Sequence, residues 1–243
     1  MLLSTSVSIG VADSVKAAFQ GSTISYPLTS QEWISILISR KKNFLFLHIP
    51  KTAGNSIVYS LRSFSEANLI EAVSAEPHLQ MNNFWLHDRK LGQHKHLSAA
   101  DYCNAYGREN IEPLFRFSCI RNPWDRLISV YFFWKGIGHI KSDKLDEFDP
   151  HEFEKMLKLP HAHTSYTKFL SIENKLFVDF LMRFESLDDD FARVCEALGL
   201  SGVDLPHKNK SNHAPYRSYY DTRLKNIVAQ LHEEDISIFK YSF

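Results

Sequence analysis

Residues suited to anion binding cluster in the stretch HIPKTAGNS, residues 48–56. Lys51 supplies a mobile ammonium group, and Gly54 allows a close approach to the backbone. Asn55 and Ser56 add polar side chains where a helix is expected to start. Free backbone N–H groups at a helix start attract phosphate and sulfate. We therefore predict a phosphate- or sulfate-binding loop, although the stretch alone also fits an ordinary strand-to-helix turn with a surface lysine.

A second group of polar residues occurs in FSCIRNPWDRLISVYFF, residues 117–133. Arg121 is placed at the end of a predicted strand, and Ser129 follows eight residues later, about two helical turns along. A guanidinium and a hydroxyl so placed can bind one phosphate through charge-assisted hydrogen bonds. Considered separately, Arg121 also fits an ion pair at the surface, and Ser129 also fits a small packing residue. Together with the first loop, they predict a ligand with two anionic ends.

The Walker A loop of nucleotide hydrolases is the main alternative for the first stretch. That motif reads G-x-x-x-x-G-K-[ST], with the lysine directly after a glycine. Here Lys51 precedes Gly54, which is the only glycine of the loop. The sequence therefore disfavours a standard nucleotide hydrolase.

Both polar turns follow stretches that are predicted to be strands. Residues 44–49 are mostly apolar and leave no polar face, as expected for a strand covered on both sides in a parallel sheet. Residues 115–120 form a second short strand. Ligands bind at the carboxyl ends of the strands in open α/β sheets. We therefore expect the two turns to share one site at this edge.

A helix is predicted after each turn. Ile57, Leu61 and Phe64 are spaced as one apolar stripe of a helix. In the second unit, Asn122 is a suitable N-cap and Pro123 occupies the first helical position. The apolar stripe of this second helix is predicted to comprise Leu127, Val130, Tyr131 and Trp134.

Further elements are predicted from local patterns. We expect a peripheral segment at 1–30, a helix at 31–42, loops at 66–100, a strand at 178–184, helices at 188–198 and 221–232, and a polar loop at 205–216. Asp149 and Pro150 mark a helix start within 136–173, which is otherwise irregular and is expected to be a substrate-side insertion. Gly199 is expected to end the helix at 188–198. The aromatic tail, residues 239–243, is expected to pack on the core.

Length and composition restrict the class of protein. The 243 residues suit a single α/β domain over residues 1–243. Lys and Arg total 28 and so do Asp and Glu, so bulk attraction to nucleic acid or to an anionic membrane is not expected. Cys103, Cys119 and Cys195 are far apart in sequence, which indicates neither a disulfide framework nor a cysteine zinc site. The N-terminal residues predict neither a signal peptide nor a membrane anchor, so we expect a cytoplasmic protein.

Both motifs resemble those of sulfotransferases that use 3′-phosphoadenosine 5′-phosphosulfate (PAPS). HIPKTAGNS is similar to their 5′-phosphosulfate loop and IRNPWDRLISVYFF to their 3′-phosphate-binding segment, in the same order. The likeness is strongest to the carbohydrate-type family 2, which includes heparan and uronyl 2-O-sulfotransferases and many bacterial enzymes. FESLDDDFARVCEALGL and LPHKNKSNHAPYRSYYD also resemble the bacterial branch. The resemblance implies a P-loop-like three-layer α/β fold, with a central parallel β-sheet flanked by helices.

The resemblance also implies roles for individual residues. Lys51 would contact the bridging oxygen and the sulfuryl group, while Arg121 and Ser129 would hold the 3′-phosphate. The 5′-phosphate would be wrapped by Thr52, Ala53, Gly54, Asn55 and Ser56. The loop that closes over the nucleotide would include Asn209, Lys210 and Ser211.

A general base is implied by a third likeness. GQHKHLSAADY, residues 92–102, resembles the His-x-His segment of the 2-O-sulfotransferases, whose second histidine is the base. By this match His96 would be the base and His94 its neighbour or a substrate contact. Histidine suits proton transfer near neutral pH. The pair could instead bind a metal, but no carboxylate or cysteine accompanies it at ligand spacing, and the family reaction needs no metal. We therefore expect none.

The leading hypothesis is transfer of a sulfuryl group from PAPS to a hydroxyl, or to an amine or amide nitrogen, of a carbohydrate or small-molecule acceptor. A kinase or nucleotide hydrolase with an atypical phosphate loop is one alternative, and a catalytically inactive nucleotide- or glycan-binding module is another. The segment 136–173 is expected to line the acceptor pocket, with His139, His161, His163 and Tyr166. The sequence specifies neither the acceptor nor the oligomeric state.

Overall fold

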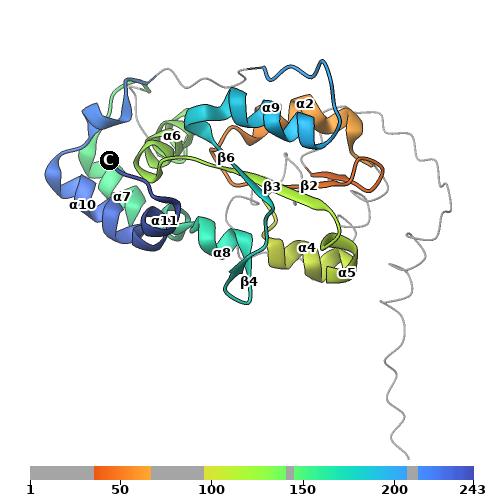
Figure 1. Cartoon of the computed structure of the whole chain (residues 1–243). Helices are drawn as coiled ribbons and strands as arrows, with labels where there is room; N and C mark the ends of the chain where they lie inside the picture. The colour runs from red at the N-terminus through yellow and green to blue at the C-terminus, as the bar shows by residue number, and fades with distance from the viewer. Residues whose placement is uncertain (1–35, 67–95, 141–144, 207–212) are drawn as a thin grey trace, which may run out of the picture.

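A four-stranded sheet forms the centre of the computed structural model, which describes residues 36–66, 96–140, 145–206 and 213–243 (Figure 1). The strand order is β1 (Leu37–Ser39), β2 (Phe44–Leu47), β3 (Phe115–Ile120) and β6 (Phe180–Arg183). β2 pairs parallel with β3, and β3 pairs parallel with β6, whereas β1 is antiparallel to β2. β4 (Ser171–Ile172) and β5 (Lys175–Leu176) form a separate small hairpin. The predicted α/β fold with a central parallel sheet is confirmed, apart from the antiparallel edge strand β1.

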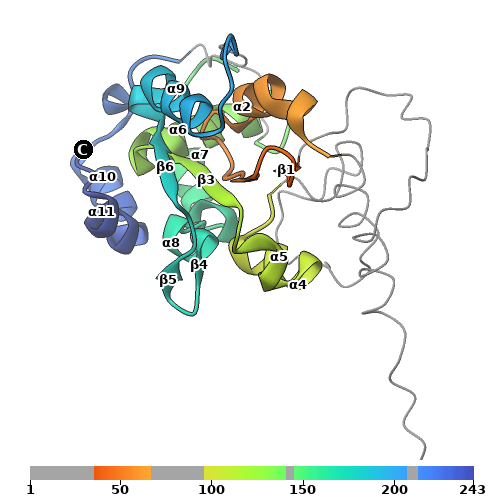
Figure 2. The same ribbon diagram turned by 45° about the vertical axis from the view of Figure 1, so that its right-hand side comes forward.

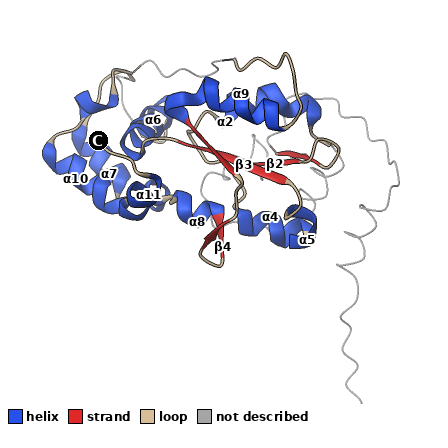
Figure 3. Ribbon diagram, viewed as in Figure 1, coloured by secondary structure: helices blue, strands red, loops and turns tan. Residues whose placement is uncertain are grey.

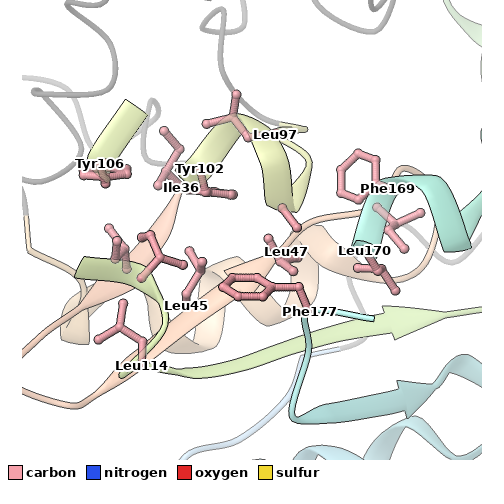
Figure 4. Close-up of a cluster of buried hydrophobic side chains, with 14 of the residues drawn as sticks. Ile36, Leu45, Leu47, Leu97, Tyr102, Tyr106, Leu114, Phe169, Leu170 and Phe177 are labelled. Atoms are coloured by element: carbon pink, nitrogen blue, oxygen red, sulfur yellow. The ribbon is translucent and has the colours of Figure 1, made fainter. Parts of the chain in front are cut away.

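Helices cover both faces of this sheet, so the fold has three layers (Figure 3). One face carries α2 (Gly54–Leu61) and α9 (Leu187–Ala197), and the other carries α4 (Ala99–Tyr106), α5 (Arg108–Ile111) and α8 (Tyr166–Leu170). Alternate residues of β2 point to opposite faces: Phe44 and Phe46 join the core under α2 and α9, whereas Leu45 and Leu47 join the opposite core. Figure 4 shows this second core, in which Leu45 and Leu47 lie near Leu114 and Phe177.

A third cluster of helices stands beside the carboxyl end of the sheet (Figure 2). It comprises α6 (Pro123–Gly136), α7 (Pro150–Leu157), α10 (Thr222–Leu231) and α11 (Glu233–Phe239). Residues of α6, α7 and α10 share one buried hydrophobic cluster, which includes Leu127, Phe153 and Val228. The short 3₁₀ helices are Arg62–Phe64 (η1), Pro160–His163 (η3), Phe184–Ser186 (η4) and Tyr216–Tyr219 (η5).

Local capping chemistry sets several helix starts where the sequence predicts them. The Asn122 side chain accepts a hydrogen bond from the Trp124 amide at 3.1 Å, and Pro123 opens α6. The Asp149 carboxylate accepts from the amides of residues 151 and 152 at the start of α7. Gly199 follows α9 with a φ of +62°, a conformation that favours glycine. The tail is also packed as predicted, with the rings of Phe243 and Trp124 5.6 Å apart.

The predicted helix at 31–42 is wrong over its described part. Residues 37–39 form β1 instead, and residues 40–43 turn the chain into β2, with Asn43 at a φ of 54°. Ile36, Leu37 and Ile38 are all buried. A run of three apolar residues buried on both faces favours an edge strand over a helix with one wet face. The sheet is therefore not entirely parallel.

Several helices have no counterpart in the sequence prediction. α4 begins at a capping box in which Ser98 and Asp101 bond reciprocally, within the region expected to be loops. α8 lies within the segment 136–173, and α11 follows α10 directly. Cys103, Cys119 and Cys195 are free thiols. Among the described residues, no helix combines the length and apolarity needed to cross a membrane. The segment 1–30 lies outside the described residues.

Candidate active site

The two predicted anion-binding turns meet at the carboxyl ends of β2 and β3. These strands are neighbours in the sheet, with Leu47 paired to Ser118. The Ser118 hydroxyl donates to the Leu47 carbonyl at 2.6 Å, which ties the two strand ends together. Beyond the strands, Nη1 of Arg121 donates to the Lys51 carbonyl at 3.4 Å. The lysine of one motif and the arginine of the other thus belong to one site.

The first turn has an uncommon backbone conformation. Lys51 and Ala53 adopt positive φ values of 65° and 67°, which are uncommon for residues other than glycine. Buried Thr52 stabilises the turn, since its hydroxyl donates to the Ile49 carbonyl at 2.9 Å. The first backbone bonds of α2 run from the amides of Ser56 and Ile57 to the Ala53 carbonyl. The N–H groups that precede Ser56 are therefore not used by the helix itself.

Gly54 has a packing role that differs from the one expected. A Cβ atom added at Gly54 would lie 1.9 Å from Nε2 of His48. The His48 ring is buried and stacks on Phe46, with ring centres 5.5 Å apart. In the direction of the missing side chain, the space is therefore filled by this imidazole rather than kept open for a ligand.

The Lys51 side chain lies against an aromatic ring of α6. Its Nζ is 4.2 Å from the centre of the Phe133 ring, which is a cation–π contact. Phe133 is 39% exposed, so part of its ring faces solvent. The contact brings the C-terminal half of α6 next to the loop after β2.

Arg121 is a buried cation with several contacts. Its residue exposure is 6%, so the alternative of an ion pair at the open surface does not apply. Nε donates to Asp125 Oδ2 at 2.7 Å, and the guanidinium carbon lies 3.9 Å from the centre of the Phe184 ring. The bonds to Asp125 and to the Lys51 carbonyl use two of the five guanidinium N–H groups.

Ser129 lies on α6 between these two contacts. It is buried, and the spacing of four residues places it in one row with Asp125 and Phe133. Asp125 contacts Arg121, and Phe133 contacts Lys51. This row of α6 therefore runs from the predicted anion-binding turn that contains Arg121 to the one that contains Lys51. Within the described part of the chain, no hydrogen bond joins Ser129 to Arg121.

His96 is brought to the same edge of the sheet. Its Nδ1 is 2.8 Å from the His48 carbonyl, and its ring centre is 4.5 Å from that of His48. Because a carbonyl oxygen can only accept, Nδ1 must carry a proton, and in the neutral ring Nε2 is then the unprotonated nitrogen. His48 directly precedes the turn that contains Lys51, so the predicted base is anchored to the start of the predicted donor loop.

Residues 35–242 match the sequence profile of the sulfotransferase family. The chain belongs to the sulfotransferase family. The match covers most of the chain, including β2, β3 and both turns. A search among curated proteins found no match. Sulfotransferases transfer sulfuryl groups, and the three-layer α/β fold with its mostly parallel sheet agrees with this membership.

Some predicted site residues of this sulfotransferase are not placed at the site. His94, Asn209, Lys210 and Ser211 lie outside the described residues. Tyr166 was expected to line the acceptor pocket, but it is fully buried, and its hydroxyl donates to the Arg121 carbonyl at 2.6 Å. Exposed His163 bonds through Nε2 to the carbonyl of Leu157, 2.9 Å away, within its own segment.

Three residues that contact the site of this sulfotransferase were missed from the sequence. They are Phe133, Phe184 and Glu185. Glu185 accepts a hydrogen bond from the Asn122 amide at 2.6 Å. A signal was available for two of them, because Phe184 and Glu185 follow β6 at the same edge of the sheet as the two turns. Phe133 gave no such signal, since it belongs to an aromatic run in a helix.

Proposed function

We propose that this sulfotransferase transfers the sulfuryl group of PAPS to a hydroxyl of a carbohydrate or small-molecule acceptor, with amine or amide nitrogen as the alternative acceptor atom. The contact between Arg121 and the Lys51 carbonyl carries the proposal. It joins two cationic turns at one edge of the sheet, and a ligand with anionic groups at two ends suits such a pair. We also propose a cytoplasmic location, which three free thiols support.

The described residues suit the two anionic ends of PAPS. In this proposal, the loop of Thr52, Ala53, Gly54, Asn55 and Ser56 binds the 5′-phosphate through N–H groups that α2 leaves unused. Arg121 and Ser129 bind the 3′-phosphate, and a phosphate can be held by the guanidinium N–H groups that Asp125 does not engage. The proposal also includes closure of residues 209–211 over the nucleotide.

The proposed reaction needs charge stabilisation and one proton acceptor. The acceptor oxygen forms a bond to sulfur as the bond from sulfur to the bridging oxygen breaks, which leaves 3′-phosphoadenosine 5′-phosphate (PAP) and a sulfate ester. Lys51 stabilises the negative charge that develops on the leaving phosphate. His96 takes the proton of the acceptor hydroxyl through Nε2, the nitrogen that its bond to the His48 carbonyl leaves unprotonated.

Nucleotide binding tests the proposal most directly. Titration calorimetry with PAP and with ATP should show tight binding of PAP and much weaker binding of ATP, because only PAP carries a 3′-phosphate. Arg121→Met should weaken PAP binding by about 10- to 100-fold, since a charge-assisted pair is lost. Arg116→Met is the matched control, because Arg116 forms a bidentate pair with Asp179 at the opposite end of β3. Equal affinity for PAP and ATP would favour the kinase or hydrolase alternative.

Turnover tests the remaining alternative. A panel of sugars, glycans and small alcohols incubated with isotopically labelled PAPS should yield at least one sulfated product by mass spectrometry. The product should disappear in Lys51→Ala. Tight PAP binding without transfer to any acceptor would instead identify an inactive nucleotide-binding module.

A further inference from the structure

The peptide unit between Arg121 and Asn122 is held at both of its polar ends. Its carbonyl, on Arg121, accepts a hydrogen bond from the Tyr166 hydroxyl at 2.6 Å. Its N–H, on Asn122, donates to Glu185 Oε1 at 2.6 Å. Two side chains from different parts of the chain therefore fix the orientation of one peptide plane.

This peptide lies in a gap between regular elements. The last pair of the β3–β6 ladder joins Ile120 to Arg183, so the sheet does not hold the peptide that follows Arg121. The first backbone bond of α6 runs from the amide of Arg126 to the carbonyl of Asn122. The helix therefore does not hold the carbonyl of Arg121 either. Tyr166 and Glu185 supply the hydrogen bonds to this peptide that neither the sheet nor the helix provides.

Tyr166 is itself fixed by a buried carboxylate. It is 0% exposed and opens α8, and its amide donates to Asp235 Oδ2 at 2.8 Å. Oδ1 of Asp235 accepts from the amide of Thr167 at 2.9 Å and from the hydroxyl of Ser165 at 3.0 Å. Burial raises the pKa of the Tyr166 phenol well above its usual range, so its hydroxyl keeps the proton that it donates. Asp235 of α11 thereby fixes the start of α8, and Tyr166 of α8 in turn fixes the Arg121 carbonyl.

Glu185 belongs to a turn that also supports the Arg121 side chain. It follows Phe184, whose ring lies under the guanidinium of Arg121. Its second oxygen, Oε2, accepts from the Tyr241 hydroxyl at 3.3 Å. The turn after β6 thus supports Arg121 at two places: Phe184 contacts its side chain, and Glu185 accepts from the N–H of the next residue, Asn122.

We propose that Tyr166 and Glu185 are positioning residues for recognition of the 3′-phosphate. Rotation of the peptide plane after Arg121 changes the direction of its Cα–Cβ bond and displaces the guanidinium group at the end of a long side chain. The two hydrogen bonds oppose this rotation and keep the guanidinium over Phe184, beside Asp125. This inference rests on the proposed function, since it assigns the 3′-phosphate to Arg121.

Adenosine 5′-phosphate and PAP differ only in the 3′-phosphate. The dissociation constant of adenosine 5′-phosphate divided by that of PAP therefore measures recognition of that group. Tyr166→Phe should reduce this ratio by about tenfold, because a buried carbonyl loses its donor and Arg121 is no longer held. The affinity for adenosine 5′-phosphate should not change. Tyr220→Phe is the matched control: its hydroxyl donates to the Trp124 carbonyl at 2.9 Å, so it also loses one such bond on α6. In this control the ratio should be preserved.

Glu185 provides a second test that does not depend on the stability of the Tyr166 variant. Glu185→Gln keeps an oxygen that accepts from the Asn122 amide and should preserve the ratio, whereas Glu185→Ala should reduce it by about tenfold. A structural role alone would lower the unfolding midpoint and weaken both nucleotides equally.

The outcomes separate this inference from the function on which it rests. If the wild type binds both nucleotides equally, the assignment of a 3′-phosphate site fails. If the wild type prefers PAP, but Tyr166→Phe and Glu185→Ala keep the full ratio, the positioning role is wrong and the proposed function stands. A reduced preference for PAP in Tyr166→Phe and in Glu185→Ala supports the inference, provided that Tyr220→Phe and Glu185→Gln keep the preference of the wild type.

Discussion

Lys51 and Phe133 contact each other across the loop after β2 and the helix α6, with Nζ 4.2 Å from the ring centre. Phe133 comes four residues after Ser129 and eight after Asp125, in one row of α6. In the proposed complex, this row leads from the 3′-phosphate, past Ser129, to the sulfuryl group beside Lys51. The acceptor in an in-line transfer lies beyond the sulfuryl group, so the exposed ring is placed where an acceptor would approach.

Phe133→Ala should therefore raise the KM for the acceptor and leave PAP affinity unchanged. Loss of one aromatic contact corresponds to an increase of about three- to tenfold in KM. Initial rates over a range of acceptor concentrations, at saturating PAPS, measure this effect. Tyr59→Ala is the control, because Tyr59, on α2, is also exposed and lies near a cation, Arg62. An unchanged acceptor KM would exclude the ring from the acceptor site.

Lys51→Ala should lower kcat by about 100- to 1000-fold, since charge that develops on the leaving phosphate loses its nearest cation. PAP affinity should fall less, because the loop N–H groups still bind the 5′-phosphate. Single-turnover rates with PAPS and calorimetry with PAP separate the two effects. Lys42→Ala removes another lysine near an aromatic ring, Phe64, and should change neither quantity. Full turnover in Lys51→Ala would remove this residue from the mechanism.

His96→Gln should lower kcat by about 100- to 10,000-fold, which is the usual contribution of a general base. PAP affinity should be preserved, since the ring is anchored to the His48 carbonyl and not to the predicted phosphate contacts. The measurement is the sulfation rate at saturating substrates. His163→Gln, at an exposed histidine of the segment 136–173, is the control. Retained sulfation in the His96 variant would assign the proton transfer to another group.

Local patterns were sufficient to predict the two strand-turn-helix units. Strand β2 has no polar face, and Asn122 and Pro123 are capping residues whose effect depends only on their neighbours in sequence. The same is true of Asp149, Asp221 and Gly199. The parallel pairing was inferred from the polar turn after each strand, because ligand sites of open α/β sheets lie at the carboxyl ends of parallel strands. Lys51 and Arg121 could therefore be expected together before their contacts were known, whereas His96 was expected only from the family resemblance.

Contacts between distant residues could not be predicted in this way. Tyr166 bonds to a carbonyl 45 positions away, and Glu185 to an amide 63 positions away, and neither has a local pattern that identifies its partner. The helical spacing of Trp33, Ile36 and Leu37 favours a helix at 31–42, and only the pairing of β1 with β2 decides for a strand. The ring that fills the space at Gly54 belongs to His48, six residues earlier, and a sequence does not specify that rotamer.

Gly54→Ala should destabilise the fold, since the new Cβ would overlap the imidazole of His48. Overpacking of this kind costs about 1–3 kcal/mol in the free energy of unfolding. The double variant with His48→Ala removes the ring, so its cost should be smaller than the sum of the single changes by about 1 kcal/mol or more. Urea unfolding measures all three variants. Gly136→Ala, where nothing lies within 4 Å, should be neutral or slightly stabilising. Additive costs at positions 48 and 54 would contradict the steric explanation.

His232 should make the fold less stable in mild acid. Burial lowers its pKa below the ordinary value of 6.5, with Arg126 acting in the same direction and the bonds to Asp235 and Ala162 opposing. The folded protein therefore keeps His232 neutral at a pH where the unfolded chain binds a proton. Stability then falls as the pH drops below 6.5, by at most about 1.4 kcal/mol per pH unit. The loss of stability caused by His232 stops once the pH is below the pKa of His232 in the folded protein, because the residue is then protonated in both states.

Asp235, in the same network, also makes the fold less stable as the pH falls. The pKa of Asp235 is lowered overall: burial raises it, but the hydrogen bonds from Thr167 and Tyr166 outweigh burial. Its contribution to stability is lost at lower pH, as the carboxylate becomes protonated in the fold. Urea midpoints at pH 7.5 and 5.5 isolate His232, because Asp235 is ionised at both. The wild type should lose more stability between them than His232→Gln, whose amide can still donate to the Ala162 carbonyl. His163→Gln should behave as the wild type, and an equal loss in all three proteins would exclude His232 as the cause.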